Sequence, residues 1–177
     1  MFTYDETGRT TFVSTAADAG AAPCWCVVSA DGRRLYVSNT GTDSVGVYSL
    51  ADPLHPVQIQ DLPLGGARTA TPGGPLIANA FEIALDPSGR FLYAVTQATD
   101  PAAPQGNQLH TLTVAADGTL TEQAPPVVLS PGDVPANAHP QGLVAVAVSR
   151  RGRDLFTGSH FGDGVDGPAR GDDHWRG

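Results

Sequence analysis

Glu82 interrupts an apolar run, and this position needs an explanation. Residues 81–85 read FEIAL, a pattern typical of a strand. A carboxylate placed there can act as a general base that takes a proton from water. The alternatives are a carboxylate that faces a wet channel or pairs with an arginine. We predict Glu82 as a catalytic base.

His139 is the second candidate for proton transfer. It lies in the loop sequence NAHPQG, residues 137–142, and an imidazole is well suited to relaying a proton near neutral pH. The alternative is a structural loop histidine. His110 instead lies on a predicted third strand, where we expect it to pack or to face solvent.

Arg68 is a candidate for binding an anionic group. It lies in the loop GGARTATPGGP, residues 65–75, and its guanidinium can pair with a phosphate or a carboxylate. The loop lacks the spacing of a Walker phosphate-binding motif. The alternative is a single surface charge.

Cys24 and Cys26 are the only cysteines in the chain. On a strand, positions i and i+2 point to one face, but the backbone is poorly suited to a disulfide between them. No further ligands occur at a spacing typical of a metal site, and the tail aspartates lack the spacing of a calcium loop. We predict a buried, reduced pair and no metal. A redox or metal role is the alternative.

The composition limits the fold and the partners. Charged residues make up 16% of the 177, with 21 Gly and 15 Pro, which favours short strands joined by many turns. A net charge of −8 disfavours nucleic acid and anionic membranes as partners. No apolar run is long enough to span a bilayer, and no secretion signal is visible, so we expect a cytoplasmic protein.

One hairpin pattern occurs twice. CWCVVSADGRRLYVS at residues 24–38 is matched by FEIALDPSGRFLYAV at residues 81–95, and the turn glycine recurs 57 residues later, at Gly89 after Gly32. Each hairpin is followed by two further segments rich in Val, Leu and Thr, which predicts a four-stranded meander repeated in the same order. These strands are expected at residues 24–30, 34–40, 44–50 and 56–62, and again at 81–87, 91–97, 107–114 and 120–129.

Such repeats predict an all-β fold, a partial β-propeller of about three four-stranded antiparallel blades. A β-sandwich is the alternative. We predict a propeller region at residues 1–161 and a disordered tail at residues 162–177. Within the propeller region the expected parts are a half blade at 1–20, blades at 21–66 and 76–130, and a half blade at 139–161.

Three blades do not close a ring of four to eight. The chain is therefore expected to be a fragment of a longer protein. The alternatives are an oligomer that completes the ring and an unstable product. Open blade faces also favour self-association.

The segment PCWCVVSADGRRLYVSNTGTDSVGVY, residues 23–48, resembles the repeat of the lactonase-type seven-bladed propellers. This family includes 6-phosphogluconolactonase-like and YVTN-repeat proteins. The resemblance implies hydrolysis of a small-molecule lactone, or cyclisation chemistry on carboxymuconates, without a cofactor. The alternative is a non-catalytic YVTN-type module that binds a protein or ligand partner.

The resemblance also implies where the site lies. It is expected at the starts of the innermost strands and the ends of the second strands, where Asn39 and Gln97 stand. Together with Arg68, they are the predicted substrate-binding residues. The family often has Pro-Arg-His at the inner-strand start, and this chain departs from it with Trp25, Glu82 and Gly142.

Overall fold

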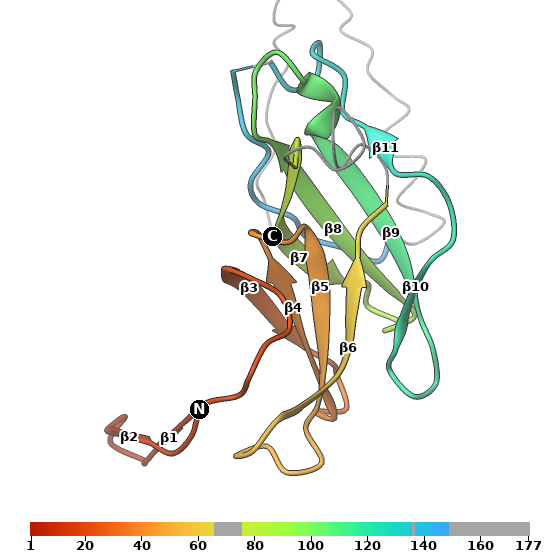
Figure 1. The fold of residues 1–177 in the computed structure, drawn as a ribbon. Coiled ribbons are helices and arrows are strands. Elements are labelled where there is room, and N and C mark those ends of the chain that lie inside the picture. Colours follow the sequence, from red (N-terminus) through yellow and green to blue (C-terminus); the bar gives the residue numbers. More distant parts are fainter. Residues whose placement is uncertain (66–75, 136, 149–177) are drawn as a thin grey trace, which may run out of the picture. The chain divides into compact units, whose positions relative to one another are not determined.

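The computed structural model describes residues 1–65, 76–135 and 137–148 (Figure 1). The chain divides into two units, Met1–Ala147 and Val148–Gly177, and the account below concerns the first. Its described residues form β-strands and one short 3-10 turn, Pro104–Gly106, without an α-helix. Arg68, most of the predicted last half blade and the predicted tail lie outside the described residues.

The first sheet is a four-stranded antiparallel meander. Its strands are β3 (Pro23–Val28), β4 (Arg34–Asn39), β5 (Ser44–Ser49) and β6 (Val57–Pro63), in that order across the sheet. Gly32 closes the first hairpin with a φ of 71°, a conformation that residues with a Cβ rarely adopt. The four strands predicted for this sheet are confirmed.

The second sheet repeats the meander with β7 (Ala78–Leu85), β8 (Phe91–Ala98), β9 (Gln108–Val114) and β10 (Leu120–Glu122). The prediction of one continuous strand over residues 120–129 is wrong. Pro125 and Pro126 have no N–H to donate to a ladder, which explains the break. A separate short strand, β11 (Val127–Val128), pairs with the other end of β9.

The first two strands of each sheet pair in the same register. Cys26 of β3 pairs with Val37 of β4, and 57 residues later Ile83 of β7 pairs with Ala94 of β8. Both inner strands carry a bulge just before this pair, formed by residues 24–25 in β3 and 81–82 in β7. The repeat therefore extends to the irregularities of the strands, as well as to their order.

An apolar core lies between the sheets. Four of its residues come from the first sheet and the loop after it, and six come from the second sheet. They are Tyr36, Val45, Val47 and Leu64, and Ala80, Ile83, Leu92, Ala94, Leu112 and Leu120. Figure 1 shows β3 and β4 beside β7, and these strands are in contact. Two similar meanders packed face to face through their strands are successive blades, so the fold is a partial β-propeller, as predicted.

Alternate residues of β4, and Thr40 just after it, bind backbone oxygens of the second blade. Arg34 Nε donates to Asp117 O at 2.7 Å, and Tyr36 OH donates to Gly118 O at 3.1 Å. Ser38 Oγ donates to Phe81 O, and Thr40 Oγ1 donates to Ala80 O at 2.8 Å. Because successive strand residues alternate between faces, these four side chains form one row toward the second blade.

Two segments outside the two blades complete the described chain. β1 (Phe2–Tyr4) and β2 (Thr10–Phe12) pair only with each other, and the Phe2 and Phe12 rings meet edge to face at 5.5 Å. Residues 142–148, which belong to the predicted last half blade, do not form a strand. The rest of that half blade lies outside the described residues.

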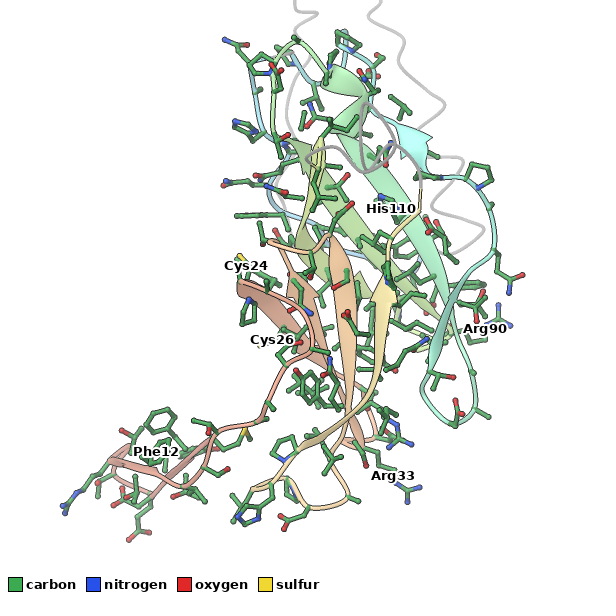
Figure 2. All side chains as sticks on the ribbon, in the orientation of Figure 1. Phe12, Cys24, Cys26, Arg33, Arg90 and His110 are labelled. Carbon is green, nitrogen blue, oxygen red and sulfur yellow. The ribbon has the colours of Figure 1, made fainter. Side chains whose placement is uncertain are left out.

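The prediction that Cys24 and Cys26 are buried is wrong: both thiols are exposed (Figure 2). β3 is an edge strand that pairs only with β4, and all of its residues except Val27 are exposed. The bulge at residues 24–25 also interrupts the regular alternation between the two cysteines. Apolar composition predicted burial, but of this strand only Val27 packs against the core, and no described strand pairs with its outer edge.

The exposure of both thiols predicts rapid labelling. Both cysteines of the native chain should react with a thiol-specific chromogenic disulfide at rates close to those in denaturant. Cys24→Ser and Cys26→Ser should each remove one equivalent. Protection of either thiol until the chain unfolds would contradict the exposed β3.

Gln60 of β6 provides a test of how the blades are joined. Its side-chain amide accepts from Leu120 N at 2.7 Å and donates to Leu120 O at 2.9 Å. Gln60→Ala leaves both backbone groups without these partners, so we expect a loss of about 2 kcal/mol in the free energy of unfolding. Urea denaturation measures it, with the exposed Gln123→Ala as the matched control. Equal effects of the two substitutions would contradict the assigned role.

Candidate functional site

Glu82 lies in the bulge in the middle of β7, and its side chain is half-buried. We call this bulge, its counterpart in β3 and the nearby ends of β4 and β8 the rim. The Ser38 hydroxyl fixes the bulge from the neighbouring blade, since it accepts from Trp25 N at 3.0 Å and donates to Phe81 O. Trp25 stands 57 residues before Glu82, at the same place in the other bulge. One hydroxyl therefore links the two bulges that carry Trp25 and Glu82.

The segment at residues 139–142 lies against the second blade beside Glu82 and Gln97. Gln97 Nε2 donates to Pro140 O at 3.0 Å. Gly142 has a φ of 82°, and a Cβ built on it would stand 3.9 Å from Glu82 Oε2. His139 is exposed next to Pro140. One short segment, residues 139–142, thus contacts Gln97, passes close to Glu82 and carries His139.

Asn39 does not share this arrangement. It is fully buried at the end of β4, and its Nδ2 donates to Asp18 Oδ1 at 3.1 Å and Asp61 Oδ1 at 3.4 Å. By register its counterpart in the second blade is Thr96, and the counterpart of Gln97 is Thr40. The side chains of Thr40 and Gln97 form equivalent hydrogen bonds, since each donates to a backbone oxygen of the segment that follows its own blade.

The Asp18 carboxylate organises the face of the first blade away from the second. Besides Asn39, its Oδ1 accepts from Gly20 N at 2.8 Å and from Gln58 Nε2 at 3.1 Å. Burial, a hydrogen bond to Asp18 and the nearby charges of Asp18 and Asp61 raise the pKa of Tyr48. This network uses Asn39 Nδ2 structurally, whereas the buried Asn39 Oδ1 has no hydrogen-bond partner among the described residues. A substrate-binding role for Asn39 stays a prediction.

His110 and Glu122 form a buried pair that the sequence did not reveal. His110 Nδ1 lies 2.7 Å from Glu122 Oε1, and Glu122 Oε2 accepts from Gly65 N at 2.7 Å. Glu122 is opposite Leu112 in the register, so the pair is diagonal across the β9–β10 hairpin. In the sequence, Asp117-Gly118 favours a tight hairpin turn between the two strands, which bears on this register but does not reveal the pair. The pair ties the outer end of the first blade to the second.

The rim offers a carboxylate, an amide and an imidazole on neighbouring segments, which are groups suited to general base chemistry and hydrogen bonding. Within residues 1–65, 76–135 and 137–148, no three acidic, cysteine or histidine side chains cluster closely enough to hold a metal ion. Nor does that part of the chain contain a helix long and apolar enough to cross a membrane.

Comparisons with known proteins agree with the fold. No family model and no curated protein matches the chain. A Lactobacillus plantarum protein of known structure is 20% identical, with a TM-score of 0.57, over 71% of this chain and 34% of its own. A "putative 6-phosphogluconolactonase" from Bacteroides fragilis is 18% identical, with a TM-score of 0.52, over 71% and 36%.

A third structure, a "putative 6-phosphogluconolactonase" from Bacteroides uniformis, is 15% identical, with a TM-score of 0.52, over 75% of this chain and 37% of its own. At these identities the likeness concerns the fold. The chain spans about a third of the length of the structures it matches.

The His110–Glu122 pair predicts a stability change with pH. Burial alone would raise the pKa of Glu122, but hydrogen bonds from His110 and Gly65 and the charge of His110 outweigh it, so this pKa is lowered from 4.5. The stabilisation is therefore complete above the unfolded-state pKa and disappears as the pH falls through the folded-state value.

Glu122→Gln should accordingly lower the free energy of unfolding at neutral pH, and the difference from the native chain should shrink below about pH 4.5. Urea denaturation at several pH values measures this, with Glu6→Gln in the β1–β2 turn as the control. A Glu122→Gln effect that stays constant over the acid range would contradict this role of the carboxylate.

Proposed function

We propose that the protein belongs to the 6-phosphogluconolactonase-like propellers and hydrolyses a small-molecule lactone. The observation that carries the proposal is the half-buried Glu82 in an inner-strand bulge at the rim, close to Gly142. Two structures with the same fold are described as "putative 6-phosphogluconolactonase", which supports this substrate class. Since the chain spans about a third of them, the activity is proposed for the propeller to which these blades belong.

In the proposed reaction Glu82 takes a proton from a water molecule whose oxygen attacks the lactone carbonyl. The bond between the carbonyl carbon and the ring oxygen then breaks, and a proton passes to the departing ring oxygen, so that a hydroxy acid is formed. His139 relays this proton. Gln97 and Arg68 hold the substrate through hydrogen bonds and charge, and Asn39 supports the rim.

The proposal predicts a large effect of Glu82→Gln. This substitution keeps the shape of the side chain and removes the base, so lactone hydrolysis above the spontaneous rate should fall about a hundredfold. A pH-stat assay with 6-phosphogluconolactone and glucono-δ-lactone measures it, and circular dichroism checks the fold. Glu6→Gln is the control with the same chemical change. Full activity in folded Glu82→Gln would remove Glu82 from the mechanism.

The second candidate is a non-catalytic YVTN-type module that binds a protein or ligand partner. Trp25 favours it, because this exposed aromatic side chain occupies the place in the first blade that Glu82 has in the second. The same assay separates the two candidates. Hydrolysis at no more than the spontaneous rate, by a folded preparation, would support the binding module.

A further inference from the structure

A pocket lies at the hairpin-turn end of the two blades, where three turns meet. It has a volume of about 310 Å³ and lies between the first blade's β3–β4 turn and the second blade's β7–β8 and β9–β10 turns. We call it the turn pocket. Its walls include the apolar Leu85 and Val114, with the Arg33 and Arg34 side chains beside them. Its size and mixed lining suit a small organic ligand.

Arg34 is held in a fixed place at this pocket. Its Nε donates to Asp117 O at 2.7 Å and its Nη1 donates to Arg33 O at 2.8 Å. The side chain crosses the β9–β10 turn at Gly118, where an added Cβ would come within 2.5 Å of Arg34 Cγ. These contacts use only part of the five donors of a guanidinium. The remaining donors are pre-positioned for a further acceptor.

Neither arginine of the pocket forms an ion pair with a described residue. The carboxylates that line the pocket form hydrogen bonds within their own hairpin turns. Asp31 accepts from Ser29 Oγ and Arg33 N. Asp117 accepts from Thr119 Oγ1 and N. Hydrogen bonds, first of all from Ser29 and Thr119 respectively, lower the pKa of both carboxyl groups, so both are charged at neutral pH. The pocket therefore combines free guanidinium donors with a local charge near zero.

The internal repeat shows that a second arginine is not required for the fold at this position. Arg33 and Arg34 correspond to Arg90 and Phe91 of the second blade. Arg90 lies over the Phe91 ring at 5.4 Å and does not line the turn pocket, and Figure 2 shows Arg33 and Arg90 on different sheets. Of the two blades, only the first has two adjacent arginines at this position, and both of them line the turn pocket.

We propose that the turn pocket binds a small organic monocarboxylate. The carboxylate accepts hydrogen bonds from Arg33 and Arg34, since a guanidinium fork matches the two carboxylate oxygens. The hydrocarbon part lies on Leu85 and Val114. A dianion such as phosphate fits less well, because the charges of Asp31 and Asp117 at the pocket repel a second negative charge. This site is separate from the proposed lactonase site and does not depend on it.

The test is a nuclear magnetic resonance titration of the full 177-residue chain at low salt. The probes are 3-methylbutanoate, its neutral amide 3-methylbutanamide, and inorganic phosphate. With the carboxylate we expect saturable shifts of the backbone amides of Gly89 and Gly118, which line the pocket. We expect little response to the amide, and affinity should fall as salt is added. Equal shifts with the amide, or none with the carboxylate, would overturn the proposal.

Matched variants complete the test. Arg33→Gln should weaken 3-methylbutanoate binding about tenfold, which is the loss of one charge-assisted hydrogen-bonding partner. Arg90→Gln makes the same change at the repeat counterpart outside the pocket and should leave binding unaltered. Arg34→Phe, which copies the second blade, should also weaken binding, provided that it folds. Equal losses in Arg33→Gln and Arg90→Gln, or stronger binding of phosphate, would contradict a monocarboxylate site.

Discussion

The structure depends on one row of side chains that binds the backbone of the neighbouring blade. The row consists of three alternate residues of β4 and the residue just after it: Arg34, Tyr36, Ser38 and Thr40. Each donates to a carbonyl oxygen of the second blade. Apolar contacts alone would allow the sheets to slide, because the hydrophobic effect is not directional. Hydrogen bonds to fixed carbonyls determine the register between the blades. The two candidate sites lie at the two ends of this row.

The row also explains how the repeat can keep its geometry while its chemistry changes. A carbonyl oxygen is present at every residue, so the side chain beside it in the second blade is free to vary. Ser38 binds Phe81 O whatever side chain follows at position 82. The same bulge therefore carries Trp25 in one blade and Glu82 in the next. Different rim residues can thus appear on one scaffold.

The sequence predicted the strands well where the signal was local. The turn glycines Gly32 and Gly89, flanked by alternating apolar residues, located the hairpins and their repeat. It did not predict the bulges, because they depend on the pairing of β3 with β4 and of β7 with β8. It also overestimated the burial of Cys24 and Cys26, since burial depends on which strands lie nearby. The His110–Glu122 pair required the same non-local information.

The two faces of the first blade are stabilised by different means, and this has a consequence for its exposed surface. Toward the second blade, the polar side chains of β4 find backbone oxygens. On the opposite face, Asn39 and Gln58 share the Asp18 carboxylate, which the preceding segment supplies. Asp18 Oδ1 accepts hydrogen bonds from Asn39, Gln58 and Gly20, so the donors on this part of the face are satisfied locally. Cys26 and Val28 of β3 remain exposed on the same face. The outer face of the first blade therefore keeps an exposed apolar strip at β3 among the described residues.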